Sequence, residues 1–210
     1  MSDLFPKWTN RLPILLIIGS LLVAGGVIAG MTYYFTPKYT RVGYSPIQPA
    51  PFSHKVHVNQ ISMDCRYCHD TVDKSWYAEL PSASTCMNCH EQILRDDPRL
   101  ALVRESVTNN QPIPWVKVHT LPDYVYFNHA AHVNQGVSCL ECHGDVNNMD
   151  EIRVVQPLSM SFCLDCHRNP NPRLRPLDKV TQLDWLPTNN VPIHKDWNLP
   201  MLESCSTCHR

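Results

Sequence analysis

Excess charge, spare cysteine and glycine are what this sequence lacks. It carries 18 lysines and arginines against 19 aspartates and glutamates, so the formal net charge is -1. Without a basic bias, nothing in the composition indicates nucleic-acid binding. Glycine is scarce, at 7, whereas proline is abundant, at 18. All 10 cysteines fall into copies of one motif, so no thiol is left over for an unrelated disulfide or metal site.

The repeated motif reads C-x-x-C-H and occurs five times. It is the attachment signature of c-type haem, in which two thiols about one helical turn apart form thioethers with the vinyl groups. The histidine that follows ligates the iron. We therefore predict five covalently bound c-type haems. The attachment cysteines are Cys65, Cys68, Cys86, Cys89, Cys139, Cys142, Cys163, Cys166, Cys205 and Cys208. The predicted proximal ligands are His69, His90, His143, His167 and His209.

Disulfides and zinc sites are the alternative uses for so many cysteines. Ten cysteines in a secreted chain are enough for five disulfides, but disulfides give no reason for a histidine after every second cysteine. Structural zinc sites pair one C-x-x-C with a second such pair or with spaced histidines. Five identical C-x-x-C-H units build such sites poorly, so haem attachment is the better interpretation.

One long apolar run lies near the N-terminus. We predict a single transmembrane anchor at residues 12–36, because about 20 apolar residues span a bilayer as a helix. Lys7 and Arg11 precede the run, which favours a cytoplasmic location for residues 1–11. The rest of the chain is then expected on the periplasmic face of the inner membrane, the side on which c-type haem is attached.

A cleaved signal peptide is the alternative interpretation of this run. Val27, Ile28 and Ala29 resemble a small-residue cleavage site. The run is long for the apolar part of a signal peptide, so a retained anchor is the favoured prediction. A proline-rich spacer at residues 37–51 then leads to a pentahaem domain at residues 52–210.

Two F-x-H-x-x-H segments precede the first and the third motif. A second motif follows each segment, which gives two dihaem units at about residues 52–90 and 127–167. A half-unit follows at residues 194–210, where His194 leads Cys205. Self-similarity of this kind indicates repeated structural units.

The histidines outside the motifs supply candidate distal ligands. His54, His129 and His194 each lead a motif by a similar distance, so each is predicted to ligate the haem of that motif. His57 and His132 are predicted to ligate the two haems without a local partner, with the exact pairing left open. His119 is an alternative ligand or a partner of a haem propionate. Bis-histidine ligation favours lower potentials than ligation by histidine and methionine.

Five porphyrins would dominate the core of a domain this short. We therefore expect a mainly α and irregular fold, with short helices, many loops and little sheet. Residues 168–192 carry Arg168, Arg173, Arg175 and Lys179 among prolines. These basic residues are either solvated or directed at haem propionates or an acidic partner.

These features together resemble the pentahaem subunit of bacterial alternative complex III, a membrane quinol oxidoreductase. The single N-terminal anchor, the five motifs, the paired F-x-H-x-x-H segments and residues 115–132 carry the resemblance. The haem units also resemble the class III, cytochrome c7 type. The resemblance implies three partners: a polytopic quinol-oxidising subunit, an iron–sulfur subunit, and another cytochrome c or an oxidase. It makes the chain an electron-transfer subunit rather than an enzyme alone.

Two other functions compete with this relay. A quinol dehydrogenase of the NapC/NirT type also has one anchor and several haems, but the proline-rich spacer separates anchor and haems here. A catalytic multihaem reductase needs an open iron site, often marked by C-x-x-C-K, and this sequence has no such variant. We therefore predict no catalytic residue in this chain.

Overall fold

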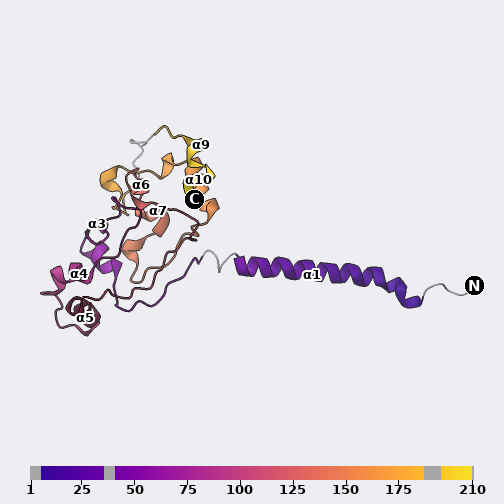
Figure 1. Ribbon diagram of the computed structural model, residues 1–210, viewed down its shortest axis with the longest axis horizontal. Helices are drawn as coiled ribbons and strands as arrows, with labels where there is room; N and C mark the ends of the chain where they lie inside the picture. Colours follow the sequence, from indigo (N-terminus) through magenta and orange to yellow (C-terminus); the bar gives the residue numbers. More distant parts are fainter. Residues whose placement is uncertain (1–5, 36–40, 187–194, 210) are drawn as a thin grey trace, which may run out of the picture. The chain divides into compact units, whose positions relative to one another are not determined.

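The chain divides into two compact units, Met1–Arg41 and Val42–Arg210. Their structure is a computed structural model that describes residues 6–35, 41–186 and 195–209. Part of the expected spacer, residues 37–40, and the predicted ligand His194 lie outside the described residues. Figure 1 draws both units.

The first unit is a short 3-10 turn, η1 (Lys7–Arg11), followed by one long helix, α1 (Leu12–Phe35). Helix α1 contains no charged residue, and its side chains are exposed along its whole length. A helix that is apolar on every side is stable only inside lipid or against a partner. Its length and composition suffice to cross a membrane, a test that a signal sequence also passes.

The second unit consists of short helices joined by loops. The only bridge among its described residues is an isolated antiparallel pair, Val137 with Leu174. The expectation of a mainly helical and irregular fold with little sheet is therefore confirmed. The elements in chain order are η2 (Lys55–Gln60), α3 (Cys65–Cys68), α4 (Ala83–His90), η3 (Pro98–Leu100), α5 (Ala101–Asn109), α6 (His129–Val133), α7 (Cys139–His143), η4 (Val146–Asn148), α8 (Met160–Arg168), η5 (Asn171–Arg173), η6 (Leu177–Lys179), α9 (Leu199–Leu202) and α10 (Cys205–Cys208).

Each C-x-x-C-H motif forms a short helix or ends one. A Ser or Asp side chain caps the helices α3, α7 and α8, because a side-chain oxygen at the N-cap accepts an otherwise unpaired backbone N–H. Asp64 accepts from the Arg66 N–H before α3, Ser138 from the Leu140 N–H before α7, and Ser159 from the Phe162 N–H before α8. Local sequence therefore determines where these three motif helices begin.

The apolar core of this unit is small. Ten apolar residues are buried in the described part, and none of them is aromatic: Ala50, Val72, Ala83, Val103, Ile113, Met149, Val154, Leu174, Val180 and Leu183. A unit of this length with so few large buried side chains has too little apolar area to fold on its own. Large prosthetic groups are needed to complete this core.

Residues 174–181 tie the first and third motifs together. The Arg175 N–H donates to the Gly136 carbonyl at 2.8 Å, and the buried Ser138 hydroxyl donates to the Val180 carbonyl at 2.8 Å. Thr181 donates to the Asp64 carboxylate at 2.8 Å. Gly136 has φ +94 and its Cα faces the Arg175 carbonyl, so a side chain at this position would collide with backbone.

The N-cap of α3 gives a stability prediction. Asp64 receives hydrogen bonds from Arg66 and Thr181, and these bonds, with the Arg66 side chain first, lower the pKa of its carboxyl to about 2. Asp64→Ala is expected to cost about 1 kcal/mol, the usual value of an N-cap. A depressed pKa stabilises the fold above the ordinary carboxyl pKa, and this stability is lost as the pH falls from about 4 to about 2.

Thermal melts of the haem-loaded protein at neutral and acid pH measure this effect. Asp70→Ala is the matched control, because Asp70 is exposed and its carboxylate caps no motif helix. The Asp64 variant should lose melting temperature at neutral pH and show a weaker acid dependence than the control. Equal melts for the two variants at both pH values would contradict the prediction.

Candidate haem attachment sites

The two F-x-H-x-x-H segments have the same local structure. Phe52 lies edge-on to His54 at 4.8 Å and is stacked on His57 at 4.4 Å. Phe127 lies edge-on to His129 at 4.8 Å and is stacked on His132, here at 4.5 Å. In each copy one phenyl ring therefore fixes two imidazoles, which explains why the phenylalanine belongs to the repeat.

The second histidine of each segment faces the histidine of a later motif. The ring centres of His57 and His90 are 6.1 Å apart, and those of His132 and His167 are also 6.1 Å apart. A metal–imidazole bond is about 2 Å long, and the ring centre lies about 1 Å behind the nitrogen. Two imidazoles on opposite sides of one iron therefore have centres about 6 Å apart. Both pairs have the separation that a bis-histidine haem needs.

Backbone carbonyls hold most of these imidazoles in one tautomer. A carbonyl oxygen can only accept a hydrogen bond, so an Nδ1 beside it carries the proton and leaves Nε2 bare for a metal. The contacts run from His57 to Ser53, His69 to Glu79, His90 to Ile93, His129 to Trp76, His132 to Asn128, His167 to Leu202, and His209 to Tyr124, at 2.7–3.1 Å.

The first and third motifs share a buried histidine cluster. His143 lies 6.4 Å from His129 with nearly parallel rings, and 4.5 Å from His119 with the rings at 87°. Burial, followed by the charge of His119, lowers the pKa of His143 to about 3. Burial, followed by the charges of His69 and His57, lowers the pKa of His54 to about 4. These imidazoles are neutral at physiological pH, which is the form that binds a metal.

The residues of the five motifs fit c-type haem. The Nδ1 of His54 is buried without a hydrogen-bond partner among the described residues. In the part of the chain that the structure describes, no disulfide joins the cysteines, and no cluster of His, Cys, Asp and Glu has the arrangement of a metal site. When bound, c-type haem supplies an iron that accepts and donates single electrons.

The motifs form a contiguous series in space that differs from their order in the chain. Asn88 of the second motif donates to the Tyr67 hydroxyl of the first motif at 3.1 Å. The pKa of the Cys65 thiol is raised, chiefly by its hydrogen bond with Cys139 of the third motif and then by burial. In Figure 1, α4 and α10 lie at opposite ends of this unit, with α7 between them.

The series continues from the third motif to the last. Burial, followed by the charges of Cys163 and Cys166, raises the pKa of Cys142 to about 11, so the third motif lies beside the fourth. His167 of the fourth motif contacts the Leu202 carbonyl just before the fifth, at 2.9 Å. The spatial order of the motifs is therefore second, first, third, fourth and fifth.

The basic residues of 168–192 form ion pairs or hydrogen bonds with other residues of this chain. Arg168 pairs with Glu203 at 3.3 Å, Arg173 pairs with Asp165, and Lys179 pairs with Asp178 at 3.5 Å. Arg175 is buried and donates to the Gln182 carbonyl at 2.7 Å. Sequence reasoning missed these pairings, and it also missed the backbone carbonyls that orient the histidines. A carbonyl is common to every residue, so it leaves no signal in the sequence.

The short-helix fold and the five attachment motifs define a multihaem c-type cytochrome, an electron-transfer protein. Residues 125–210 match the family described as cytochrome c7 and related cytochrome c. The chain is also similar to the menaquinone reductase, multihaem cytochrome c subunit, of Nitratidesulfovibrio vulgaris (strain Hildenborough). The two are 35% identical over 145 residues, which cover 59% of this chain and 69% of that relative. The chain belongs to the family of multihaem cytochromes c that includes this subunit.

Proposed function

We propose that the chain is a membrane-anchored electron relay within a quinone oxidoreductase complex. The observation that carries this proposal is the contiguous series of five attachment motifs, with the second and the fifth at opposite ends. A series with two separated ends can exchange electrons with one partner at each end. Helix α1 serves as the single-pass anchor in the inner membrane, and the haem domain lies in the periplasm.

Bis-histidine ligation of every haem is part of this proposal. His90 and His57 ligate the haem of the second motif, and His167 and His132 that of the fourth, because each pair lies 6.1 Å apart. His143 and His129, at 6.4 Å, ligate the haem of the third motif. We assign the remaining histidines as pairs: His69 with His54, and His209 with His194.

We assign His119 as a residue that packs beside a ligand rather than as a ligand itself, and its position next to His143 supports this assignment. Its ring centre is 4.5 Å from that of His143, and the two rings are perpendicular. This separation is too short for an iron between them, which needs about 6 Å. His119 instead packs beside a proximal ligand. Every iron then has two histidines, which argues against a catalytic reductase with an open site.

The complex we propose is of the alternative complex III type. In this arrangement a polytopic subunit oxidises quinol, and electrons pass through an iron–sulfur subunit and this chain to another cytochrome or an oxidase. Helix α1 contains no Asp, Glu, Lys, Arg or His. Proton-coupled quinol chemistry inside a membrane usually needs one of them. The quinone site therefore belongs to a partner, which disfavours a quinol dehydrogenase of the NapC/NirT type.

Electron flow in the opposite direction is a second candidate. The relative from Nitratidesulfovibrio vulgaris is named a menaquinone reductase subunit. If this chain also serves menaquinone reduction, electrons enter from a reduced donor at one end of the series and leave toward menaquinone at the other. The same series of sites serves both directions, and the potentials of the partners determine which one operates.

The proposal is tested by measuring how fast a reduced quinone reduces the haems. The measurement is made on the purified complex and on the isolated full-length chain. Denaturing mass spectrometry should first find five haem additions on the chain. A reduced menaquinone analogue should then reduce the haems rapidly in the complex but not in the isolated chain in detergent. Dithionite, which needs no site, is the control for both samples.

Each outcome of this experiment has a definite meaning. Rapid reduction of the isolated chain, blocked by a quinone-site inhibitor, would overturn the relay and support a quinol dehydrogenase. Four or fewer haem additions would contradict the motif assignment. Menaquinone reduction by the complex with a reduced periplasmic cytochrome as donor, without the reverse reaction, would establish the second direction.

A further inference from the structure

The loop after the second motif folds back onto the histidine of that motif. His90 Nδ1 donates to the Ile93 carbonyl at 3.0 Å, and the Ile93 N–H donates to the Cys89 carbonyl at 2.9 Å. The next residue, Leu94, has φ +57. A leucine in this left-handed conformation is strained and persists only where its surroundings hold it. The carbonyl that orients His90 therefore belongs to a loop that needs external support.

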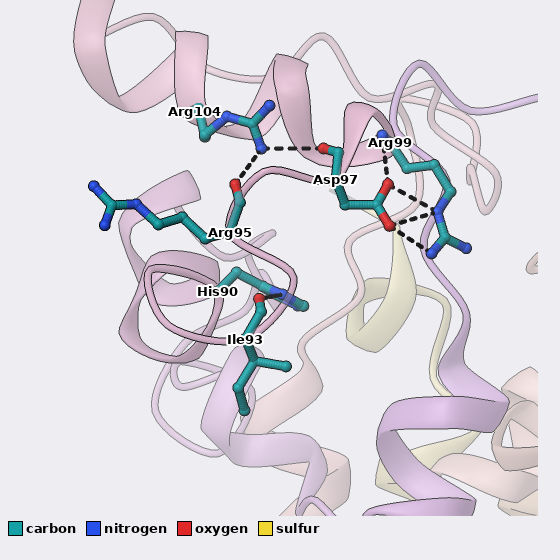
Figure 2. A network of polar contacts seen from close by, with 6 residues as sticks. All are labelled: His90, Ile93, Arg95, Asp97, Arg99 and Arg104. Atoms are coloured by element: carbon teal, nitrogen blue, oxygen red, sulfur yellow. Dashed lines mark hydrogen bonds and ion pairs between the residues drawn. The ribbon is translucent and has the colours of Figure 1, made fainter.

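Arg104 supplies this support from helix α5. Its guanidinium donates to the Arg95 carbonyl at 2.7 Å and to the Asp97 carbonyl at 3.1 Å. Figure 2 shows both bonds reaching the loop on the side opposite His90. Helix α5 is itself fixed, because its buried Val103 packs in one cluster with Ala83 of α4. One side chain on a fixed helix thus holds two carbonyls that follow the strained residue.

We propose that Arg104 is a positioning residue that sets the potential of the haem at the second motif. Arg104 acts through the loop, by keeping the Ile93 carbonyl in line with His90 Nδ1. A strong hydrogen bond from Nδ1 makes the imidazole a better electron donor to the iron. A more basic ligand stabilises the oxidised metal, so this hydrogen bond lowers the potential. The inference rests on the proposed function only in taking His90 as the proximal ligand.

Spectroelectrochemical titration of the Arg104→Gln variant tests the inference. Glutamine retains a polar group but is too short and has too few donors to hold both carbonyls. The titration curve should consist of five one-electron steps, one for each haem. One of these steps should move to a higher midpoint potential, and the midpoint potentials of the other four should not change. The iron should remain low-spin, because His90 remains bound. An electron paramagnetic resonance spectrum should show altered g values for one haem.

Arg95→Gln is the matched control. It removes one positive charge of the same kind from the loop that Arg104 supports, but it keeps the carbonyl that Arg104 holds. The Arg95 side chain is exposed and points away from His90 in Figure 2. The midpoint potentials of all five haems should match those of the wild type in this variant. An equal shift in both variants would show that charge alone is responsible and would overturn the proposal.

Arg104→Lys keeps the test decisive if the glutamine variant does not assemble. The lysine ammonium retains the charge and donates to one carbonyl, so a smaller shift in the same direction is expected. No shift in either assembled variant, or a shift of all five midpoint potentials, would overturn the role of Arg104. Mass spectrometry of the wild type separates this failure from a failure of the proposed function, since four or fewer haem additions there would instead contradict the assignment of five attachment sites.

Discussion

Replacing His132 with alanine is expected to convert one haem iron per chain from low-spin to high-spin. His132 faces His167 with 6.1 Å between ring centres, and alanine offers no ligand in its place. The vacated position should then bind carbon monoxide, one equivalent per chain, whereas the wild type should bind almost none. His57→Ala is expected to behave identically, because His57 faces His90 at the same separation.

The absorption spectrum of the dithionite-reduced protein, recorded with and without carbon monoxide, measures this effect. His119→Ala is the control, because His119 is a half-buried histidine that packs against His143 at 4.5 Å and is no iron ligand in the proposed assignment. Its spin state and its carbon monoxide binding should match those of the wild type. Carbon monoxide binding by the His119 variant, or its absence in both ligand variants, would require a new assignment of ligands.

Removing the central attachment site is expected to divide the relay into two halves. Cys139 and Cys142 belong to the motif that lies in the middle of the spatial series, with two motifs on each side. The double alanine variant should carry four haems. Rapid reduction by a physiological donor should then reach only the two haems on the donor side, whichever end the donor uses.

Stopped-flow reduction of the assembled complex counts the haems that reduce rapidly. The control is the double alanine variant at Cys205 and Cys208, which removes a haem at the end of the series. If the donor reacts at the opposite end, all four remaining haems should reduce rapidly. Rapid reduction of all four in the central variant would contradict the spatial order. If the central variant does not assemble, His132→Met tests the same order by raising one potential inside the series.

The chemistry of this protein was readable from the sequence because it depends on local spacing. Two thiols and a histidine within five residues make an attachment site wherever the chain folds, so five sites follow from the motifs alone. The short helices and the near absence of sheet were also predictable, because Asp64 and Ser138 cap helices that begin at the motifs. The apolar, uncharged run of α1 needed no tertiary information either.

The proposed pairing of the histidines and the spatial order of the motifs depend on the tertiary structure. The sequence left the partners of His57 and His132 open, because His90 and His167 are more than thirty residues away along the chain. Packing brings each pair to 6.1 Å. The third motif lies beside the first because residues 174–181, far along the chain, bind both. Backbone carbonyls such as that of Ile93 fix the imidazoles, and backbone atoms carry no sequence signal.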